Sequence, residues 1–315
     1  MKIFNSISDF KSNSKTIVTI GTFDGVHIGH KKILEKLIKS TSNSEFESLV
    51  LTFFPHPRLV LQTGTDMKQL NTIDEKVNLL DAIGIDNLVI HPFNKEFSRL
   101  TAEDFVKSVL VDTFNVAKII IGYDHRFGRN RTADINDLIE FGEKYNFEVE
   151  QISAEEVNDV SVSSTKIRNA LNEGDVTLAQ TYLDYYYLIN GTVTKGKQLG
   201  KTIGFPTANI SVKEDYKLIP KDGVYVVSCE IDSSKHYGMM NIGVNPTVEA
   251  NNQNQKIEVH LFDFEKDIYG KPITVSLLKR LRNEQKFESI DALKKQLALD
   301  KINAVSFVNS LKTSQ

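Results

Sequence analysis

Cysteine is almost absent from this chain of 315 residues: Cys229 is the single one, so no internal disulfide can form. It lies in an apolar, strand-like run, and we interpret it as a buried structural thiol. Long apolar runs are also lacking, because stretches such as 49–51 are far shorter than the roughly 20 residues of a membrane helix. Residues 1–15 lack the basic start and apolar core of a signal peptide. These absences predict a cytoplasmic protein that does not bind membranes.

A basic excess is missing as well. Lysine and arginine number 38 against 41 aspartates and glutamates, which gives a formal net charge of −3. General nucleic-acid binders usually carry a basic excess or a basic stripe, so we expect no nucleic-acid partner. If the substrates are phosphates, positive charge has to be concentrated at the binding sites.

The length fits two domains of about 100–200 residues each. Over roughly the first 180 residues, strand-like segments alternate with helical patterns, which predicts an α/β fold with a parallel sheet. The sequence 72–75 is a capping box that begins a helix, and 101–104 begins another with similar chemistry. Ligands of such folds bind beyond the carboxyl ends of the strands. The predicted strands are residues 16–20, 48–53, 88–92, 118–121 and 147–152.

The pattern changes near residue 187, where strands follow one another without long helices between them. Glycine and proline mark the turns, and this combination predicts a small β-barrel. A helix over about 290–311 closes the chain. The predicted strands of this half are residues 188–193, 223–229, 257–261 and 273–277.

A histidine pair follows the first of these strands. In the sequence 21–30, two glycines allow a tight turn and a close approach of the backbone to a ligand. His27 and His30 are three residues apart at a helix start, where free N–H groups and the helix dipole suit a phosphate. The spacing also resembles two zinc ligands, but no third ligand stands nearby in a recognisable spacing. Two ordinary surface histidines are the remaining alternative.

A second helix start carries basic side chains. Residues 163–168 read SSTKIR, and the hydroxyl groups can cap the helix. Lys166 and Arg168 lie in the first turn, where the helix dipole favours acidic residues. A bound anion would offset this conflict, so the segment predicts a phosphate site.

Three elements together resemble the FAD synthetase domain of bacterial bifunctional riboflavin kinase/FAD synthetases: HxGH at 27–30, SSTxIR at 163–168 and GYDHRFG at 122–128. The resemblance implies a Rossmann-like nucleotidyltransferase domain over residues 1–184 that transfers AMP from ATP to FMN and releases pyrophosphate. It makes His27 and His30 catalytic and the turn 53–57 the flavin-side loop, with Pro55, His56 and Pro57. The ATP-binding residues that it implies are Gly21, Phe23, Asp24, Gly25, His27, His30, Asp124, Ser164, Thr165 and Arg168.

The residue types suit this chemistry. The FMN phosphate carries about −1.5 to −2 charges near neutral pH, so it is already an ionised nucleophile and needs no strong general base. What remains is to bring two anions together and to stabilise charge on the leaving pyrophosphate, by positioning and fixed donors. Histidines and an arginine can do this, with Mg²⁺ shielding the phosphates.

The second half has a glycine-rich turn at 200–209 that leads into a strand. Thr207 and Asn209 alternate with apolar neighbours, so both oxygens can face one side. Two hard oxygen ligands leave room for water and phosphate, as Mg²⁺ prefers. The alternative is a polar turn held by local side-chain hydrogen bonds.

The segments 204–209, 223–225, 241–247, 257–260 and 281–287 occur in the order seen in riboflavin kinases, which this half resembles. The resemblance implies a β-barrel kinase domain with a terminal helix over residues 185–315. It makes Thr207 and Asn209 the metal ligands, Glu258 the catalytic base, and Arg282 and Phe287 flavin-side residues. For the ATP of this domain it implies Gly196, Lys201, Gly204, Thr207 and Asn209.

Here a base is required, because the nucleophile is the neutral 5′-hydroxyl of riboflavin. A positioned carboxylate that accepts its proton is a common solution in phosphoryl transfer. Glu258 should share a strand face with His260, while Ile257, Val259 and Leu261 face the core. A solvated glutamate on an outward strand face is the alternative.

The chain departs from the family pattern at a few positions. Residues 184–186 read Asp-Tyr-Tyr in place of Gly-Arg-Pro, His125 replaces an aromatic such as Phe, Thr132-Ala133 stands where Gly is common, and Phe54 replaces an acidic residue. Two other functions therefore stay open beside a bifunctional enzyme that makes FMN and FAD. One is an active riboflavin kinase whose N-terminal domain uses a different nucleotidyl acceptor. The other is a non-catalytic flavin-binding protein.

Overall fold

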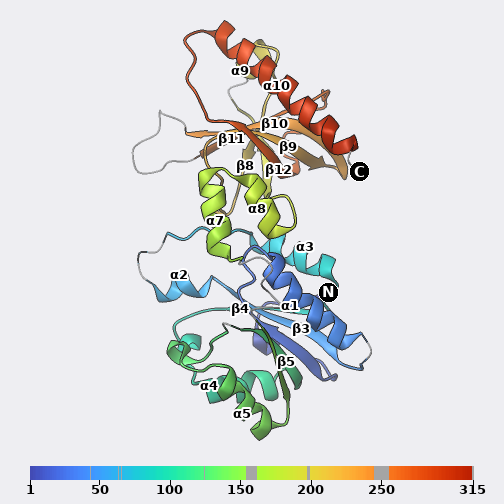
Figure 1. Ribbon diagram of the computed structural model, residues 1–315, viewed down its shortest axis with the longest axis vertical. Helices are drawn as coiled ribbons and strands as arrows, with labels where there is room; N and C mark the ends of the chain where they lie inside the picture. Colours follow the sequence, from blue (N-terminus) through green and yellow to red (C-terminus); the bar gives the residue numbers. More distant parts are fainter. Residues whose placement is uncertain are drawn as a thin grey trace. The chain divides into compact units, whose positions relative to one another are not determined.

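The chain folds into two compact units, Met1–Ser164 and Thr165–Gln315 (Figure 1). The structure is a computed structural model that describes residues 1–42, 44–62, 64, 66–123, 125–153, 162–196, 199–244 and 255–313. Asp124 and residues 245–247, which the sequence analysis singled out, lie outside the described residues. The domain boundary at 184/185 stays a prediction.

Unit 1 is built on a six-stranded sheet with the order β1-β4-β3-β2-β5-β6, in which every pair is parallel. The fold class is the α/β architecture that the alternating pattern predicts. All five predicted strands are present, and the sequence analysis missed only the short edge strand β1 among those of this sheet. The strands are β1 (Lys2–Phe4), β2 (Thr16–Ile20), β3 (Glu47–Phe54), β4 (Asn87–Pro92), β5 (Val116–Gly122) and β6 (Glu148–Ile152).

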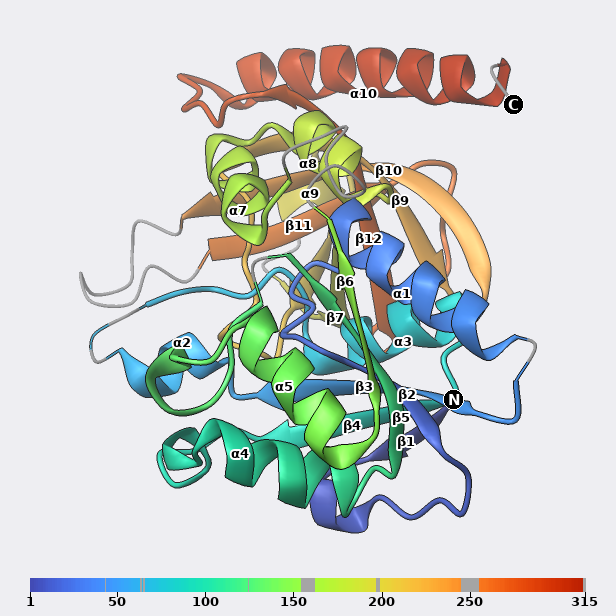
Figure 2. The same ribbon diagram turned by 60° about the horizontal axis from the view of Figure 1, so that its bottom comes forward.

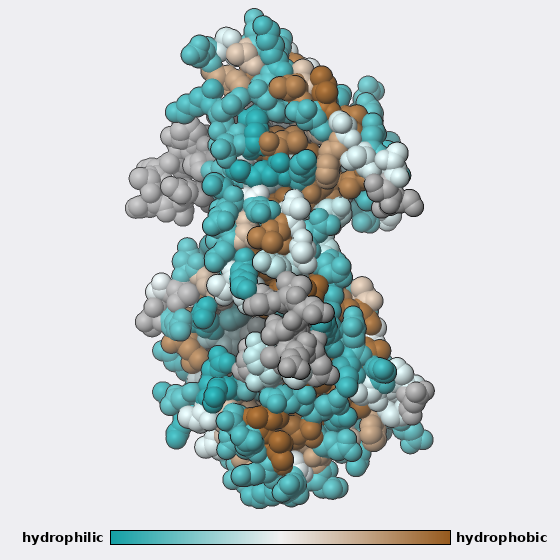
Figure 3. Space-filling model, viewed as in Figure 1, coloured by the Kyte–Doolittle hydropathy of each residue, from teal (hydrophilic) through white to brown (hydrophobic). Residues whose placement is uncertain are grey.

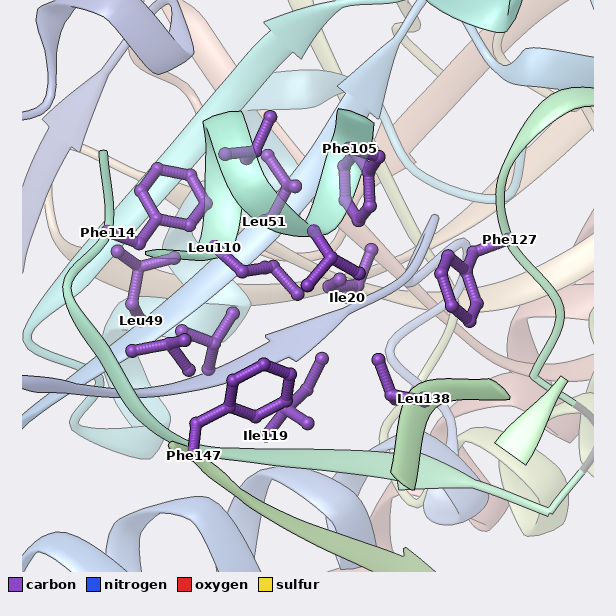
Figure 4. Packing of buried hydrophobic residues seen from close by; sticks show 14 of the residues in the cluster. Ile20, Leu49, Leu51, Phe105, Leu110, Phe114, Ile119, Phe127, Leu138 and Phe147 are labelled. Carbon is purple, nitrogen blue, oxygen red and sulfur yellow. The ribbon is translucent and has the colours of Figure 1, made fainter. Parts of the chain in front are cut away.

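Helices cover both faces of this sheet, which explains why its strands are buried apolar runs. On one face, α1 (Ile28–Thr41) and α3 (Ile73–Ile83) place Leu34, Leu37 and Leu80 against the strands. On the other face pack α4 (Ala102–Phe105), its continuation as a π-helix (Val106–Val111), and α5 (Ile135–Tyr145) (Figure 2). Figure 4 shows Phe105, Leu110, Phe114, Leu138 and Phe147 of this second cluster around sheet residues such as Ile20 and Leu51.

The strand order reverses between β2 and β5. From β2 the chain moves outward through β3 to β4 and then returns to β5 on the other side of β2. Loops that follow the two strands at such a switch point diverge and leave room for a ligand at the carboxyl edge of the sheet. Those loops are 21–27, which leads into α1, and the segment after Gly122.

Unit 2 is a closed antiparallel barrel of six strands with the order β10-β11-β8-β7-β12-β9. It confirms the small barrel predicted from the turn pattern. Its strands are β7 (Leu188–Thr194), β8 (Ala208–Ser211), β9 (Gly223–Ile231), β10 (Ser234–Val244), β11 (Gln255–Leu261) and β12 (Pro272–Arg282).

Helices flank the barrel. The predicted C-terminal helix is α10 (Ile290–Thr313), whose Ala304 and Val308 pack against Val226 and Leu278 of β9 and β12. The helix predicted at SSTKIR is α7 (Ser164–Glu173), and α8 (Val176–Leu183) follows it and contacts β12. A short α9 (Leu199–Thr202) lies in the connection between β7 and β8.

The surface of the described residues is mainly hydrophilic on the face that Figure 3 draws, with apolar side chains in small separate groups. A helix long and apolar enough to cross a membrane does not occur in the described part of the chain. Cys229 is buried in β9, as the sequence predicts, and burial raises the pKa of its thiol to about 12.

Candidate active sites

The loop after β2 is tightly folded. Gly25 has a φ of +90°, and Phe23 has a φ of 46° although it carries a side chain, which is an uncommon conformation. The Phe23 ring is 1% exposed, and a Cβ on Gly21 would lie 3.1 Å from it. The positive φ at residue 25 and the close approach at residue 21 favour glycine at both positions, and the loop places the start of α1 at the carboxyl edge of the sheet.

The two predicted histidines lie together. His27 is the N-cap of α1, and its Nδ1 accepts a hydrogen bond of 3.4 Å from the backbone N–H of His30. The two rings stack with a centroid distance of 3.7 Å. Because Nδ1 of His27 is an acceptor, the neutral ring carries its proton on Nε2. Burial, aided by the nearby charges of His27 and Lys76, holds the pKa of His30 well below its usual value, so His30 is a neutral ring at physiological pH.

The start of α3 is bonded to this loop. The Asp24 carboxylate, 1% exposed, accepts backbone hydrogen bonds from Leu70 at 2.9 Å and Asn71 at 3.4 Å. From α3, the buried Lys76 donates a hydrogen bond of 2.7 Å from Nζ to the carbonyl oxygen of Thr22. Burial lowers the pKa of Lys76 to about 8, although the charge of Asp24 raises it in part. The loop is thus bonded to the start of α3 in two ways: its Asp24 carboxylate accepts backbone hydrogen bonds, and its Thr22 carbonyl oxygen accepts one from the Lys76 ammonium.

The end of unit 1 also reaches this loop. The hydroxyl of Ser164, the first residue of α7, donates a hydrogen bond of 2.8 Å to the carbonyl oxygen of Asp24. Thr165 is exposed and Arg168 half-buried in the first turn of α7, within unit 2. The structure therefore places Ser164 beside the HxGH loop, as a contact of the backbone of Asp24.

The strand β3 ends in the turn that the sequence analysis assigned to the flavin, and β5 ends in the segment that contains the departure His125. Beyond β3, Pro55 is exposed, and His56 and Pro57 are half-buried at the start of α2 (Pro57–Leu61). His56 caps α2, since its Nδ1 accepts a 3.1 Å hydrogen bond from the N–H of Arg58. Beyond β5, the departure His125 stacks on Phe127 at a centroid distance of 6.2 Å, so an imidazole occupies the aromatic position.

In unit 2, a row of polar side chains crosses the barrel. Glu258 on β11 is paired directly with Asn209 on β8 and, on its other side, with Asn241 on β10. Directly opposite residues of antiparallel strands share a face and have Cβ atoms about 4.5–5.5 Å apart. The predicted base and the predicted metal ligand are therefore adjacent, although 49 positions of the sequence separate them. Their apolar strand neighbours Ile257 and Val259 are buried.

Glycines bring the turn before β8 onto this row. A Cβ on Gly196 would lie 2.0 Å from Nδ2 of Asn209, so the backbone of residue 196 touches this side chain. A Cβ on Gly200 would lie 2.2 Å from the carbonyl oxygen of Phe205 and 3.4 Å from Oγ1 of Thr207. Gly204 has a φ of +85°, which favours glycine. The side chain of Lys201 lies outside the described part of the structure.

Two groups near Glu258 modify its surroundings. Lys256, two residues away on the same strand, forms an ion pair with the Glu258 carboxylate. His260 shares the face of Glu258, as alternation predicts, but it is buried, not solvated. Its Nδ1 lies 2.8 Å from the carbonyl oxygen of Pro206, and burial lowers its pKa. His260 thereby ties β11 to the turn that precedes Thr207.

Arg282 is held by the C-terminal helix. Its Nε and Nη2 donate to the carboxylate of Asp300 on α10 at 2.8–3.1 Å, and Asp300 is 2% exposed. Gln296 adds a further 2.8 Å hydrogen bond to the same carboxylate. The Arg282 guanidinium lies 5.8 Å from the ring centroid of Phe287. The two predicted flavin-side residues are thus neighbours, and the arginine is fixed by a buried carboxylate.

Sequence reasoning missed several residues of these two sites. For Lys76 the sequence offered an indication. The helical spacing of the apolar residues 73, 77 and 80 places residue 76 on the same buried face of α3, so a lysine stands at a core position. Asn241 was noted only as part of a motif, and Lys256 and Asp300 were not singled out. Their roles depend on strand register and on helix packing, which a single sequence does not reveal.

Comparisons with known proteins agree with this division. The FAD synthetase family model matches residues 9–166, and the riboflavin kinase family model matches residues 183–308. A bifunctional riboflavin kinase/FMN adenylyltransferase of Buchnera aphidicola subsp. Schizaphis graminum is 38% identical over 303 residues, covering 95% of this chain and 96% of that protein. The Escherichia coli protein of the same name is 36% identical over 292 residues, covering 92% of each.

A solved structure has the same fold over nearly the whole chain. It is described as a macrolide-efflux protein from Streptococcus pneumoniae, with 31% identity and a TM-score of 0.86 over 95% of this chain and 96% of that one. That description concerns the Streptococcus protein, and it differs from the names of the curated relatives. The family models, by contrast, each match the unit that contains the corresponding site. This chain belongs to the bifunctional riboflavin kinase/FMN adenylyltransferase family.

Proposed function

We propose that each unit of this enzyme performs one of the two reactions with the residues described above. Unit 2 phosphorylates riboflavin to FMN, and unit 1 adenylylates FMN to FAD. ATP is the co-substrate of both reactions. The observation that supports this division most strongly is the direct pairing of Glu258 with Asn209, which joins a base to a phosphate and metal ligand inside the barrel unit.

In the kinase reaction, Glu258 accepts the proton of the riboflavin 5′-hydroxyl as its oxygen attacks the γ-phosphorus of ATP. The bond from that phosphorus to the β–γ bridging oxygen breaks, and ADP leaves. Lys256 keeps the carboxylate oriented along its strand, and Gly196 lies against Asn209 on the expected nucleotide side. Riboflavin is expected near Arg282 and Phe287.

The residues present suit Mg²⁺, which the kinase reaction calls for. Thr207 supplies a hydroxyl oxygen and Asn209 an amide oxygen, and both are hard ligands. Two protein ligands leave coordination positions for waters and phosphate oxygens, the arrangement that Mg²⁺ usually adopts. When bound, the ion would neutralise charge on the ATP phosphates. Asn209 is the more buried of the two, at 8% exposed, whereas Thr207 is half-buried.

In the adenylylation reaction, a phosphate oxygen of FMN attacks the α-phosphorus of ATP. The bond to the α–β bridging oxygen breaks, and pyrophosphate leaves with its charge. His27 and His30 donate N–H groups to the phosphates, and the partial positive charge at the N-terminus of α1 favours the same anions. By resemblance, Gly21, Phe23, Asp24, Gly25, Asp124, Ser164, Thr165 and Arg168 complete the ATP site. The FMN ring is expected at Pro55, His56 and Pro57.

The observation that supports this assignment is the position of HxGH at the switch point between β2 and β5. Neutral histidines are suitable donors there, because a proton on His30 is disfavoured by burial. We further propose that the enzyme acts in the cytoplasm on riboflavin, FMN and ATP. A single buried cysteine is in keeping with that compartment.

The test is to incubate purified protein with riboflavin and Mg-ATP and to separate the flavins by chromatography. We expect FMN to appear first and FAD to follow. FMN without FAD would favour a different nucleotidyl acceptor for unit 1. An absence of turnover would favour a non-catalytic flavin-binding protein.

A further inference from the structure

Lys76 is an unusual residue for its position. It lies on the buried stripe of α3 and is 2% exposed. Removing an ammonium from water costs several kcal/mol unless partners compensate, and a Met or Leu would fill the same space at lower cost. Among the described residues, its one hydrogen bond is the 2.7 Å bond to the carbonyl oxygen of Thr22. A retained buried charge of this kind is a marker of functional sites.

The bond connects Lys76 to the backbone of the adenylylation loop. Thr22 lies between Gly21 and Phe23, and its carbonyl oxygen also accepts a 3.2 Å hydrogen bond from the hydroxyl of Thr52 on β3. Two residues later, the Asp24 carboxylate holds the backbone of Leu70 and Asn71 just before α3. Hydrogen bonds therefore connect the loop to the start of α3, and Lys76 contributes a positively charged side chain to this connection.

The chemistry of this site favours positive charge near the phosphates. FMN and ATP are both polyanions, and pyrophosphate leaves with additional charge. The two histidines supply donors but not a fixed charge, since His30 stays neutral and the Nδ1 of His27 is an acceptor. The titratable groups coupled to Lys76 are Asp24 from the loop and His30 from the start of α1. Neither offers a permanent positive charge, and Arg168 of the proposed ATP site belongs to unit 2.

We propose that Lys76 is a positioning residue of the adenylylation site: its ammonium fixes the Thr22–Asp24 turn and provides the buried positive charge behind the two histidines. This inference rests on the proposed assignment of FMN adenylylation to unit 1. It adds the start of α3 to the elements of the proposed adenylylation site. It also makes adenylylation dependent on the protonation of one lysine.

The experiment measures both reactions in wild type, Lys76→Met, Lys76→Arg and the control Lys39→Met, whose lysine is exposed on α1. FMN is supplied for adenylylation, and riboflavin for the kinase reaction, from pH 6 to 10. We expect Lys76→Met to lose roughly 10²-fold of the adenylylation kcat, the effect of removing one preorganised electrostatic group. Its kinase rate should stay within about twofold of wild type, because the kinase residues lie in the other unit. Lys39→Met should match wild type in both reactions.

The pH profile separates a charge role from a purely structural one. Wild-type adenylylation should decline as the pH rises through about 8, where Lys76 loses its proton. Arginine stays protonated over this range, so Lys76→Arg should recover at least about tenfold of the loss and show no decline near pH 8. A kinase profile without that decline is the internal control.

Three results would overturn the proposal: a folded Lys76→Met protein with wild-type adenylylation, a decline near pH 8 that persists in Lys76→Arg, or a parallel loss of both reactions in Lys76→Met. The last result would assign Lys76 to the fold alone. If wild type itself makes no FAD from FMN, the proposed function of unit 1 fails instead, and that outcome is distinct from all three.

Discussion

His27 and His30 show how two identical residue types differ in role through their surroundings. His27 caps α1 and accepts the N–H of His30, which fixes its tautomer. His30 stacks on His27 and forms a T-shaped contact with Phe23, with ring centroids 5.2 Å apart, within a buried environment that keeps it neutral. We therefore expect His30 to act by hydrogen bonding to phosphate, not by proton transfer.

Replacing His30 by alanine tests that role. His30→Ala should lower adenylylation by roughly 10²–10³-fold, equivalent to about 2.7–4 kcal/mol of transition-state stabilisation. FMN formation from riboflavin by the same protein should remain near wild type, and it serves as the control for folding. A comparable loss of kinase activity in a folded variant would refute the assignment.

The buried ammonium of Lys76 should lower the stability of the fold, although we propose that it supports adenylylation. Its pKa is about 8 in the fold against an ordinary 10.5, so the folded state disfavours the protonated form. The resulting cost, about 3 kcal/mol, is present in full below pH 8 and disappears as the pH rises past 10.5. The free energy of unfolding of the wild type should therefore rise as the pH increases from about 8 to 10.5, because this cost is removed.

Lys76→Met removes that cost and also the bond to Thr22, whose loss costs about 1–3 kcal/mol. The variant should be as stable as wild type or more so at pH 7, and its advantage should shrink toward pH 10. Urea denaturation at both pH values, with Lys39→Met for comparison, measures the difference. A variant markedly less stable than wild type at pH 7 would show that burial of the ammonium costs less than we infer.

Asn209 is the residue on which the metal assignment rests. Asn209→Ala removes an oxygen ligand, so FMN formation should require more Mg²⁺ and should be slower at saturation. Adenylylation of added FMN should keep its wild-type Mg²⁺ dependence, because that reaction takes place in the other unit. An unchanged Mg²⁺ titration of FMN formation would count against Asn209 as a ligand.

At the scale of elements, the register between β8 and β11 decides the kinase site. A slip of one residue would turn Glu258 toward the core and Val259 outward. The sequence predicts β11 and the side on which Glu258 lies, because Ile257, Val259 and Leu261 alternate with polar residues. It does not predict the β8 partner, since pairing across 49 positions depends on closure of the barrel.

Local signals predicted other elements well. The Thr72–Glu75 capping box is present with both of its hydrogen bonds, at 3.0 and 3.1 Å. The strands of the α/β half follow from their buried apolar runs. The contacts of α3 with the HxGH loop were not predictable, because Asp24 and Lys76 meet that loop only through tertiary packing. The short edge strand β1 has too few residues to show a period.

A departure from the family pattern also has a local explanation. Asp184, in place of glycine, ends α8 in a left-handed conformation with a φ of 59°. Aspartate is among the few residues that tolerate this conformation. The helix thus ends at the same kind of cap as glycine would provide.

The cap of α3 links stability to adenylylation. Thr72→Ala should cost about 1 kcal/mol of stability, because the side chain accepts the N–H of Glu75. It should also lower adenylylation more than phosphorylation, since Lys76 is held by the same helix. Thr101→Ala, which removes the equivalent cap of α4, is the matched control: a similar loss of stability with normal adenylylation. Equal effects of the two variants on FAD formation would argue against a role for α3.

For the whole molecule, the two units solve different chemical problems with the same co-substrate. Riboflavin offers a neutral hydroxyl, so we expect the Glu258 carboxylate, which is paired with Asn209 in unit 2, to act as the base. FMN offers an ionised phosphate, so unit 1 contains donors and a buried cation but needs no such base. The product of the first reaction is the substrate of the second, and the flavin leaves unit 2 with the charge that unit 1 requires.

This contrast can be tested in one protein with two substrates. Glu258→Gln keeps the size and hydrogen-bonding shape of the side chain but cannot accept the hydroxyl proton. Loss of a general base should cost roughly 10²–10⁴-fold in the rate of FMN formation. Riboflavin binding should change less, because the lost interaction matters mainly in the transition state.

The most direct measurement is therefore the FAD yield of Glu258→Gln fed with riboflavin in one reaction and with FMN in another. With riboflavin the variant should stall before FMN, and with FMN it should make FAD at the wild-type rate. If it phosphorylates riboflavin at close to the normal rate, Glu258 is not the base. If it fails on FMN as well while remaining folded, the two reactions are not divided between the two units as proposed.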